Sequence, residues 1–178
     1  MDQTILSVID TAVKIGLGAA IAGISTHVHA RWTGRREDRR EQFQRKVKAL
    51  EVIAQNVEEF THCTLKYWAL ISEWGIRTIK GDSLPQDRID KLSAAQIELT
   101  AAYKHMTGSE AQLLLLGETK AQKLLREYGE TASRFTKKAF VGGAPLSRDE
   151  SQKCRQEILN ARSELFFELS RLYIAPLK

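Results

Sequence analysis

The first 30 residues place apolar and polar side chains at helical spacing. At about 100° per residue, the large apolar side chains share one broad face, and the polar ones form a narrow stripe opposite it, interrupted mainly by Ile21. The apolar face consists of Ile5, Leu6, Ile9, Val13, Leu17, Ala20 and Ile24. The polar stripe consists of Gln3, Ser7, Asp10, Lys14, Gly18, Ser25 and His29. A helix that only anchors a protein in a membrane needs no polar stripe, so the pattern predicts a membrane helix that lies beside copies of itself.

The length of this stretch matches a membrane crossing. A helix from Ile5 to Val28 extends about 36 Å, which exceeds the apolar core of a bilayer at about 30 Å. Asp10 and Lys14 oppose insertion, because each costs about 2.5–3.5 kcal/mol at the centre of a membrane helix, but their i, i+4 spacing lets them pair. Small residues four apart let helix backbones approach closely; the pairs are Gly16/Ala20, Ala19/Gly23 and Gly18/Ala22. We therefore expect a transmembrane helix over residues 1–30.

Three other interpretations of residues 1–30 stay open. A cleaved signal peptide has a positively charged start, whereas this chain begins MDQT and its arginines come later. An interfacial amphipathic helix carries Lys and Arg on its polar face, whereas this stripe holds one lysine. A core helix of a soluble domain fits poorly with the small, uniformly apolar run from Ile15 to Ile24. The pattern favours the membrane span.

The positive charge of the chain is concentrated directly after this stretch. The chain has 27 Lys and Arg against 22 Asp and Glu, a net charge of +5. Residues 31–48 hold eight basic and three acidic side chains, so residues 49–178 are nearly neutral and do not predict a nucleic-acid-binding face. Positive residues flank the cytoplasmic end of a membrane helix, which predicts a bacterial inner-membrane protein with its N-terminus outside. The basic residues expected at anionic lipid headgroups are Arg31, Arg35, Arg36, Arg39 and Arg40.

A second helical pattern follows, with apolar residues at alternating spacings of three and four. Its predicted buried face consists of Phe43, Val47, Leu50, Ala54, Val57, Thr61, Thr64, Trp68 and Ile71. Gly34 is the only break expected between the membrane helix and this helix, which fades near Lys80. The predicted organisation is a transmembrane helix over residues 1–30, a basic juxtamembrane segment over residues 31–48 and a cytoplasmic helical bundle over residues 49–178.

Capping residues and glycines divide the next part of the chain into helices. Residues 82–85 read Asp-Ser-Leu-Pro, a helix start with a capping residue before a proline. That helix is expected to end at Thr107-Gly108, and Ser109 is expected to open the next one. Gly117 is expected to kink or divide this next helix before a further helical stretch over residues 119–140.

The last predicted helix follows the clearest loop of the chain, Gly-Gly-Ala-Pro at residues 142–145. Ser147 and Glu150 have the spacing of a capping box, which opens a helix. No strand-like alternation is present anywhere in the sequence. The predicted fold class is therefore all-α, with a single N-terminal transmembrane helix followed by a cytoplasmic bundle of four or five helices.

The sequence carries none of the usual catalytic patterns. HExxH, GxxxxGK, GxSxG and paired metal-ligand spacings are missing, so we expect no cofactor, no metal and no enzyme. Cys63 and Cys154 are lone thiols, which fit a reduced compartment better than a disulfide framework. The polar stripe is then the strongest functional pattern, because its side chains would face the lumen of a pore. The expected pore-lining residues are Gln3, Ser7, Asp10, Lys14, Gly18 and Ser25.

Arg155 and Asn160 come nearest to a known catalytic motif. Ribonucleases of the HEPN superfamily are small helical bundles in which a late helix carries Arg-x4-His. The arginine binds phosphate and the histidine acts as acid and base. The run Arg155-Gln-Glu-Ile-Leu-Asn160 on the predicted last helix resembles this motif, but asparagine cannot transfer protons as histidine does. The resemblance therefore implies a degenerate, vestigial ribonuclease site at Arg155 and Asn160.

The architecture as a whole resembles the small membrane accessory proteins encoded beside the RNA-guided RNA nuclease of type VI-B CRISPR systems. The similar features are one N-terminal span, an arginine-rich junction, a helical bundle of this size and the degenerate HEPN-like pair. The resemblance implies an oligomeric pore that enhances antiphage defence by depolarising the cell. It also implies an RNA-guided nuclease, or the RNA product of that nuclease, as a partner.

The expected function is thus an oligomeric membrane pore gated by a cytoplasmic helical domain. Its expected partners are the lipid bilayer and further copies of the chain, joined through residues 4–28 and through the helical bundle. The alternative is a non-conducting scaffold or regulator that docks a partner at the membrane. A third hypothesis is a HEPN-type ribonuclease that uses Arg155.

Overall fold

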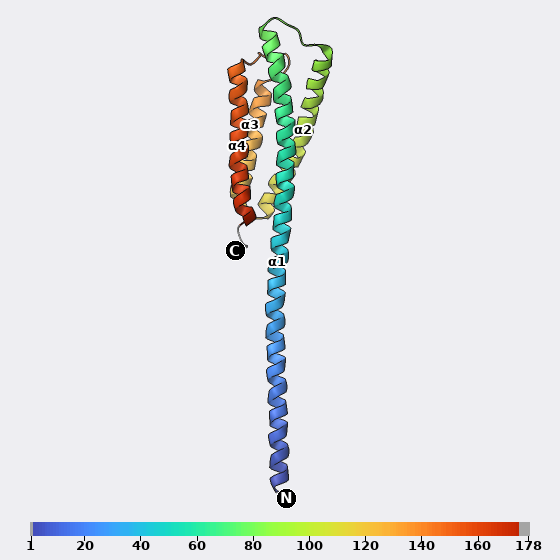
Figure 1. The fold of residues 1–178 in the computed structure, drawn as a ribbon, viewed down its shortest axis with the longest axis vertical. Coiled ribbons are helices and arrows are strands. Elements are labelled where there is room, and N and C mark those ends of the chain that lie inside the picture. The colour runs from blue at the N-terminus through green and yellow to red at the C-terminus, as the bar shows by residue number, and fades with distance from the viewer. Residues whose placement is uncertain (1, 175–178) are drawn as a thin grey trace. The chain divides into compact units, whose positions relative to one another are not determined.

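The chain is built from helices alone over the part that the structure describes. This structure is a computed structural model that describes residues 2–174, with the side chains of residues 40–174. The four helices are α1 (Asp2–Ile79), α2 (Gln86–Leu115), α3 (Thr119–Lys138) and α4 (Arg148–Ile174). The described residues divide between Arg45 and Lys46 into two compact units. The second unit contains the rest of α1 and all of α2, α3 and α4 (Figure 1), so the predicted helical bundle is confirmed and has four helices.

The transmembrane helix expected over residues 1–30 is a wrong prediction. In the described part of the chain, no helix has a stretch that is both sufficiently long and sufficiently apolar to cross a membrane. The fold class is therefore corrected to an all-helical chain without the single span that was expected before the bundle. Asp10 and Lys14 are the physical obstacle in that stretch, because a charge near the centre of a membrane helix costs about 2.5–3.5 kcal/mol.

The break expected at Gly34 is also absent, because α1 continues from Asp2 to Ile79 as one helix. A glycine inside a helix costs only about 0.5–1 kcal/mol relative to alanine, which a long helix with good helix formers on both sides can tolerate. The arginine-rich segment over residues 31–48 thus belongs to the same helix as the first element of the bundle.

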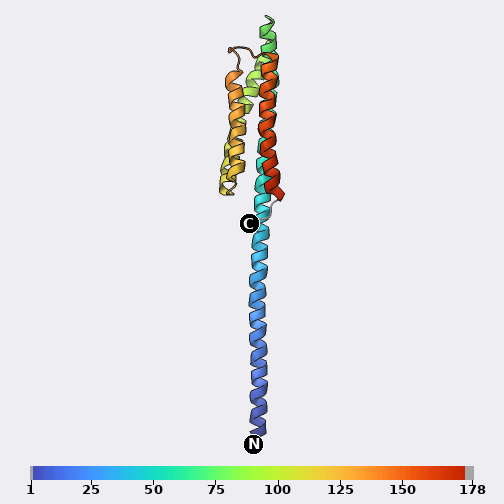
Figure 2. The ribbon, with the colours of Figure 1, turned by 90° about the vertical axis from the view of Figure 1, so that its left-hand side faces the viewer.

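Within the second unit the four helices lie side by side, and neighbours in sequence are antiparallel (Figures 1 and 2). At one end, the Tyr173 hydroxyl at the end of α4 donates a hydrogen bond to Glu51 of α1 at 3.2 Å. At the other end, Trp68 Nε1 of α1 donates to the carbonyl oxygen of Ser151, in the first turn of α4, at 2.9 Å. These contacts fix which turn of α1 faces each end of α4.

The buried face of α1 has the predicted period, but four of the nine predicted positions are only half-buried. The five that are buried as predicted are Leu50, Val57, Thr61, Thr64 and Ile71. The four half-buried ones are Phe43, Val47, Ala54 and Trp68. The structure also buries Ile53, Phe60 and Tyr67, which gives a spacing that alternates between three and four from Leu50 to Ile71, as in other packed helices. Ile53 removes more apolar surface from water than Ala54 would.

The turn between α2 and α3 is built on Gly117. Its φ is +74°, a left-handed conformation that glycine adopts without strain. The amide of Glu118 donates to the carbonyl oxygen of Leu113 at 2.9 Å, and the amide of Gly117 donates to that of Leu114 at 3.0 Å. This pair of bonds is a Schellman motif, which ends a helix. The predicted division at Gly117 is confirmed, whereas the end predicted at Thr107-Gly108 is wrong, because α2 runs through Gly108 to Leu115.

We expect Gly117→Ala to lower the free energy of unfolding by about 1 kcal/mol, because alanine is strained at a positive φ. The matched control is Gly108→Ala, which lies inside α2 with no atom within 4 Å of the added Cβ. That change should raise stability by about 0.4–1 kcal/mol. Urea denaturation followed by circular dichroism measures both. Equal effects of the two substitutions would contradict the assigned roles of these glycines.

The start of α4 follows the predicted capping box. Ser147 Oγ accepts a hydrogen bond from the Glu150 amide at 3.3 Å, and the Ser147 amide donates to Glu150 Oε2 at 3.1 Å. Both hydrogen bonds of the reciprocal motif are therefore formed. By contrast, the start of α2 has Pro85 at the cap position and no side-chain capping bond, so the capping residue expected before the proline does not cap that helix.

Gly75 brings the loop before α4 close to α1. A Cβ at position 75 would lie 3.1 Å from the carbonyl oxygen of Leu146, which is tighter than ordinary van der Waals contact. The Leu146 side chain is buried in the core on the same side. The absence of a side chain at Gly75 therefore allows the first turn of α4 to lie beside the last turns of α1, where a groove is found.

Candidate functional site

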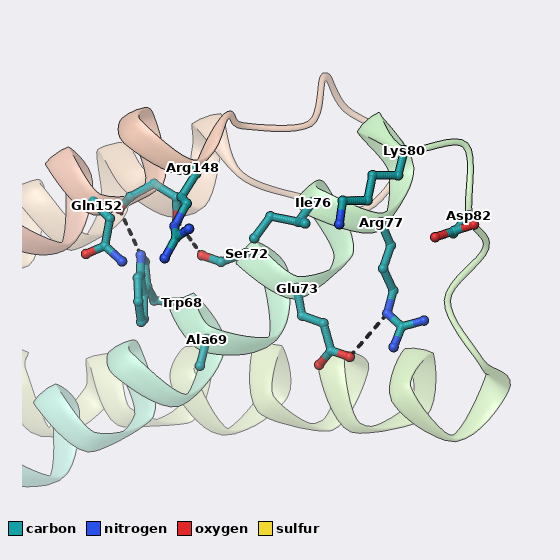
Figure 3. Close-up of a pocket in the computed structure, with 11 residues that line it drawn as sticks. Trp68, Ala69, Ser72, Glu73, Ile76, Arg77, Lys80, Asp82, Arg148 and Gln152 are labelled. Atoms are coloured by element: carbon teal, nitrogen blue, oxygen red, sulfur yellow. Dashed lines mark hydrogen bonds and ion pairs between the residues drawn. The ribbon is translucent and has the colours of Figure 1, made fainter.

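A groove lies between the last turns of α1 and the first turns of α4, with a volume of about 620 Å³ (Figure 3). We refer to it as the α1–α4 groove. Its walls combine aromatic, aliphatic, hydroxyl and charged side chains from two helices and the loop after α1. The residues that line it are Trp68, Ala69, Ser72, Glu73, Ile76, Arg77, Lys80, Asp82, Arg148, Ser151 and Gln152.

Hydrogen bonds between α1 and α4 hold the floor of the groove. Trp68 Nε1 donates to the Ser151 carbonyl oxygen at 2.9 Å. The hydroxyl groups of Ser72 and Ser151 also form a hydrogen bond with each other, and Ser151 is only 4% exposed. Because these polar groups form hydrogen bonds with one another, they hold α1 against α4. Contacts with a ligand would come from the other side chains that line the groove.

Cations outnumber carboxylates around the groove. Glu73 forms ion pairs with two arginines: Arg77 Nε lies 3.4 Å from one of its oxygens, and Arg88 Nη1 lies 3.9 Å from the other. Lys80 and Arg148 have no carboxylate oxygen within 4 Å among the described side chains. Asp82 is the one further acidic residue in the lining. The groove therefore carries surplus positive charge, which favours anions.

The structure does not bring Arg155 and Asn160 together within this chain. The Arg155 guanidinium lies over the Trp68 ring, 5.3 Å from its centroid. Asn160 is exposed, and its Oδ1 accepts a hydrogen bond from Gln156 at 2.8 Å. Two positions five apart on a helix differ by about 140° around its axis, so the two residues lie on different sides of α4. Arg155 therefore has a packing partner that the sequence resemblance did not include.

Most of the other predicted site residues lie outside the described side chains. This holds for Gln3, Ser7, Asp10, Lys14, Gly18 and Ser25, and for Arg31, Arg35, Arg36 and Arg39. Arg40 is described and is exposed on α1. Just beyond it, Arg45 forms an ion pair with Glu41 one turn away, at 2.5 Å. The lumen-facing role of the polar stripe thus stays a prediction.

Glu168 of α4 is a buried carboxylate that sequence reasoning missed. Its side chain is 2% exposed, and it accepts hydrogen bonds from Lys120 Nζ at 2.8 Å and from Arg171 Nε at 3.1 Å. Hydrogen bonds from Arg171 and Lys120 lower the pKa of Glu168 from 4.5 to about 2, against the opposing effect of burial. The i, i+3 spacing of Glu168 and Arg171 was a possible signal in the sequence, whereas the partner on α3 was not. This group links α3 to α4.

The described residues hold no group of three or more His, Cys, Asp or Glu side chains placed to bind a metal ion. Cys63 and Cys154 are free thiols in the structure, and burial raises the pKa of both. The α1–α4 groove is thus the best candidate for a binding site in the bundle. Protein-family models, curated proteins and solved structures were all compared with the chain, and no match was found.

Proposed function

We propose that the protein is a membrane-associated docking protein. In this proposal, residues 1–40 bind an anionic bilayer, and the helical bundle from Lys46 onward serves as a docking module for a partner. The observation that carries the proposal is the distribution of charge and apolar residues along α1. An apolar stretch is followed directly by a segment whose net charge equals that of the whole chain, +5.

Two membrane signals next to each other give stable attachment where one gives only marginal binding. The apolar face of residues 5–24 supplies the first signal. The second is the arginine cluster, defined as Arg31, Arg35, Arg36, Arg39 and Arg40. Each basic residue near an anionic leaflet contributes about 1 kcal/mol. Arg45 is not counted in the cluster, because Glu41 pairs with it.

The bundle itself does not supply this attraction. Residues 49–178 carry 18 basic and 17 acidic side chains, and many of the exposed ones pair within the bundle, as Lys66 does with Glu98 at 2.6 Å. Because α1 is one helix from Asp2 to Ile79, the basic cluster and the first bundle element belong to the same secondary-structure element. Membrane binding and partner docking are thereby assigned to different parts of one chain.

The test is flotation of the full chain with vesicles. We expect it to float with vesicles that contain phosphatidylglycerol, and to bind phosphatidylcholine vesicles more weakly. Replacing the five arginines of the cluster by glutamine should weaken binding to the anionic vesicles tenfold or more, since about 1 kcal/mol is lost per residue at low ionic strength. Raising the salt concentration should weaken binding of the unmodified chain in the same direction.

A matched control removes five positive charges from the bundle instead. The exposed residues chosen are Lys91, Lys104, Lys123, Lys137 and Lys153, each replaced by glutamine. This variant should bind the anionic vesicles nearly as the unmodified chain does. Equal losses in the two variants would mean that total charge governs binding, and the proposal would be wrong. Failure of the unmodified chain to float with either vesicle would also overturn it.

The finer expectations from the sequence stay predictions. They are the gated pore, self-association through residues 4–28 and the bundle, and an inner-membrane location. The similarity to type VI-B accessory proteins, with an RNA-guided nuclease or its RNA product as partner, also stays a prediction, as does a HEPN-type ribonuclease that uses Arg155.

A further inference from the structure

We propose that the α1–α4 groove binds a nucleoside phosphate. This inference goes beyond the proposed membrane function, because the groove belongs to the bundle and needs no residue before Trp68. It rests on three features of the groove: its volume, an aromatic side chain beside hydrogen-bonding groups at one end, and the surplus of positive charge.

The size and shape of the groove suit a small organic ligand. Its volume of about 620 Å³ lies within the roughly 300–1,000 Å³ of small-molecule sites. Figure 3 shows Trp68, Gln152 and Arg148 toward one end of the groove, and Arg77, Lys80 and Asp82 toward the other. A ligand that carries both a flat ring and negative charge therefore matches the side chains along the groove.

The aromatic end of the groove is held in place. Trp68 is fixed by its Nε1 bond to the Ser151 carbonyl oxygen and by the Arg155 guanidinium over its ring. An aromatic side chain that is held in this way offers a flat surface on which any of the bases can stack. Beside it, the carboxamide of Gln152 offers both a donor and an acceptor to the edge of a base.

The cations along the groove suit phosphate. Arg77 and Arg88 both form ion pairs with Glu73, so two positive charges offset its one negative charge. Lys80 and Arg148 have no carboxylate oxygen within 4 Å among the described side chains, and both are exposed. Charge-assisted hydrogen bonds from lysine and arginine to phosphate are among the strongest in proteins.

The backbone amides at the start of α4 are not the basis of this site. Ser147 and Glu150 already cap that helix, and the carboxylate of Glu150 disfavours an anion there. The side chains of Lys80 and Arg148 supply the positive charge instead. A phosphate ester could also come from a lipid headgroup, since the proposed function places the protein at a membrane. Comparing glycerol 3-phosphate with ATP therefore separates the two sources.

The experiment follows Trp68 fluorescence in the full chain. Trp32→Phe and Trp74→Phe leave Trp68 as the one tryptophan, because the chain has three. The probes are ATP, adenosine, inorganic phosphate and glycerol 3-phosphate, and calorimetry on the unmodified chain repeats each titration. We expect saturable quenching by ATP and binding at least tenfold weaker for the other three probes. Equal affinity for glycerol 3-phosphate and ATP would overturn the nucleoside assignment, as would the absence of saturable binding by ATP.

The variant Lys80→Gln/Arg148→Gln tests the two cations of the groove that form no ion pair among the described side chains. Both side chains are exposed, so the bundle should keep its helical signal and its urea midpoint. ATP affinity should fall at least tenfold, because each lost charged hydrogen bond to phosphate weakens binding severalfold. The control Lys123→Gln/Lys137→Gln removes two exposed charges from α3 and should leave the affinity within about twofold. Equal losses in both variants would show non-specific attraction and overturn the site.

Discussion

Phe60→Ala is expected to destabilise the bundle by about 3–5 kcal/mol, the usual range for removing a large aromatic side chain from a core. Phe60 is fully buried. Its ring packs edge-to-face on Tyr103 of α2, with centroids 4.8 Å apart, and on Tyr128 of α3, with centroids 5.5 Å apart. Alanine would leave a cavity at the point where α1 meets both helices, and it would also remove two aromatic contacts.

Urea denaturation of the full chain, followed by circular dichroism and by tyrosine fluorescence, measures this loss. Val52→Ala is the control, because Val52 lies on the same helix and is 40% exposed. That substitution should change the free energy of unfolding by less than about 1 kcal/mol. If Phe60→Ala cost no more than Val52→Ala, the three-ring contact could not be the centre of the core. A protein too unstable to purify would agree with the expected loss, and Phe60→Leu would then give a measurable midpoint.

The period of α1 could be predicted from the sequence, but its exact buried face could not. Leu50 and Val57 belong to both the predicted and the observed buried face. A spacing of three and four residues is satisfied whether Ile53 or Ala54 lies between them. The choice between them depends on which side chains fill the space between three other helices. Ile53 is larger than Ala54, but Tyr67 is smaller than Trp68, and the buried Tyr67 hydroxyl donates a hydrogen bond to the carbonyl oxygen of Ala139 at 2.7 Å. Size alone therefore does not decide which side chains are buried; their fit between the other helices does.

Some of the helix ends could be predicted from the sequence, and others could not. Gly117 and the Ser147/Glu150 capping box act within a few residues, so local sequence patterns were sufficient to predict them. Gly108 has the same residue type as Gly117, but it lies in the middle of α2, where buried Met106 and Ser109 on either side hold the helix against the core. Tertiary packing therefore overrides the weak helix propensity of a glycine.

The α1–α4 groove could not be predicted from the sequence. Its residues come from positions 68–82 and 148–152, and no local spacing connects the two segments. The resemblance to HEPN ribonucleases indicated Arg155, which lies about one turn from Gln152 on α4. It did not indicate Trp68, Lys80 or Arg148. Only the antiparallel packing of α1 against α4 brings these side chains to one hollow.

The double substitution Lys120→Gln/Arg171→Gln is expected to lower the melting temperature at pH 7 by roughly 5–10 °C. It leaves Glu168 buried without the two cations that hydrogen-bond to it. An uncompensated buried charge is far more costly than the loss of an exposed one, and the two cations themselves are largely exposed, at 69% and 58% for their side chains. The cost should therefore come from Glu168, although Glu168 itself is not changed.

The matched variant is Glu168→Leu, which removes the buried carboxylate and keeps both cations. Because Lys120 and Arg171 are exposed, water can solvate them after the change, and an apolar side chain of similar size suits the buried position. We expect this variant to melt within about 3 °C of the unmodified protein. If instead Glu168→Leu is the more destabilised of the two, the ion group supplies net stability through its attraction, and the reasoning from desolvation is wrong.

The pH dependence separates these explanations further. In the unmodified protein the pKa of Glu168 is lowered from 4.5 to about 2 by Arg171 and Lys120, so its contribution is fully present above pH 4.5 and is lost as the pH falls from 4.5 toward 2. In Lys120→Gln/Arg171→Gln only burial acts strongly, which raises the pKa above its unfolded value. Protonation then favours the folded state, so this variant should gain stability relative to the unmodified protein as the pH is lowered from 7 toward 4.5. Thermal denaturation across that range gives the sign of the change in stability with pH, and Glu168→Leu is the reference that lacks the carboxylate. A parallel decline of the unmodified protein and Lys120→Gln/Arg171→Gln would contradict a buried, uncompensated carboxylate.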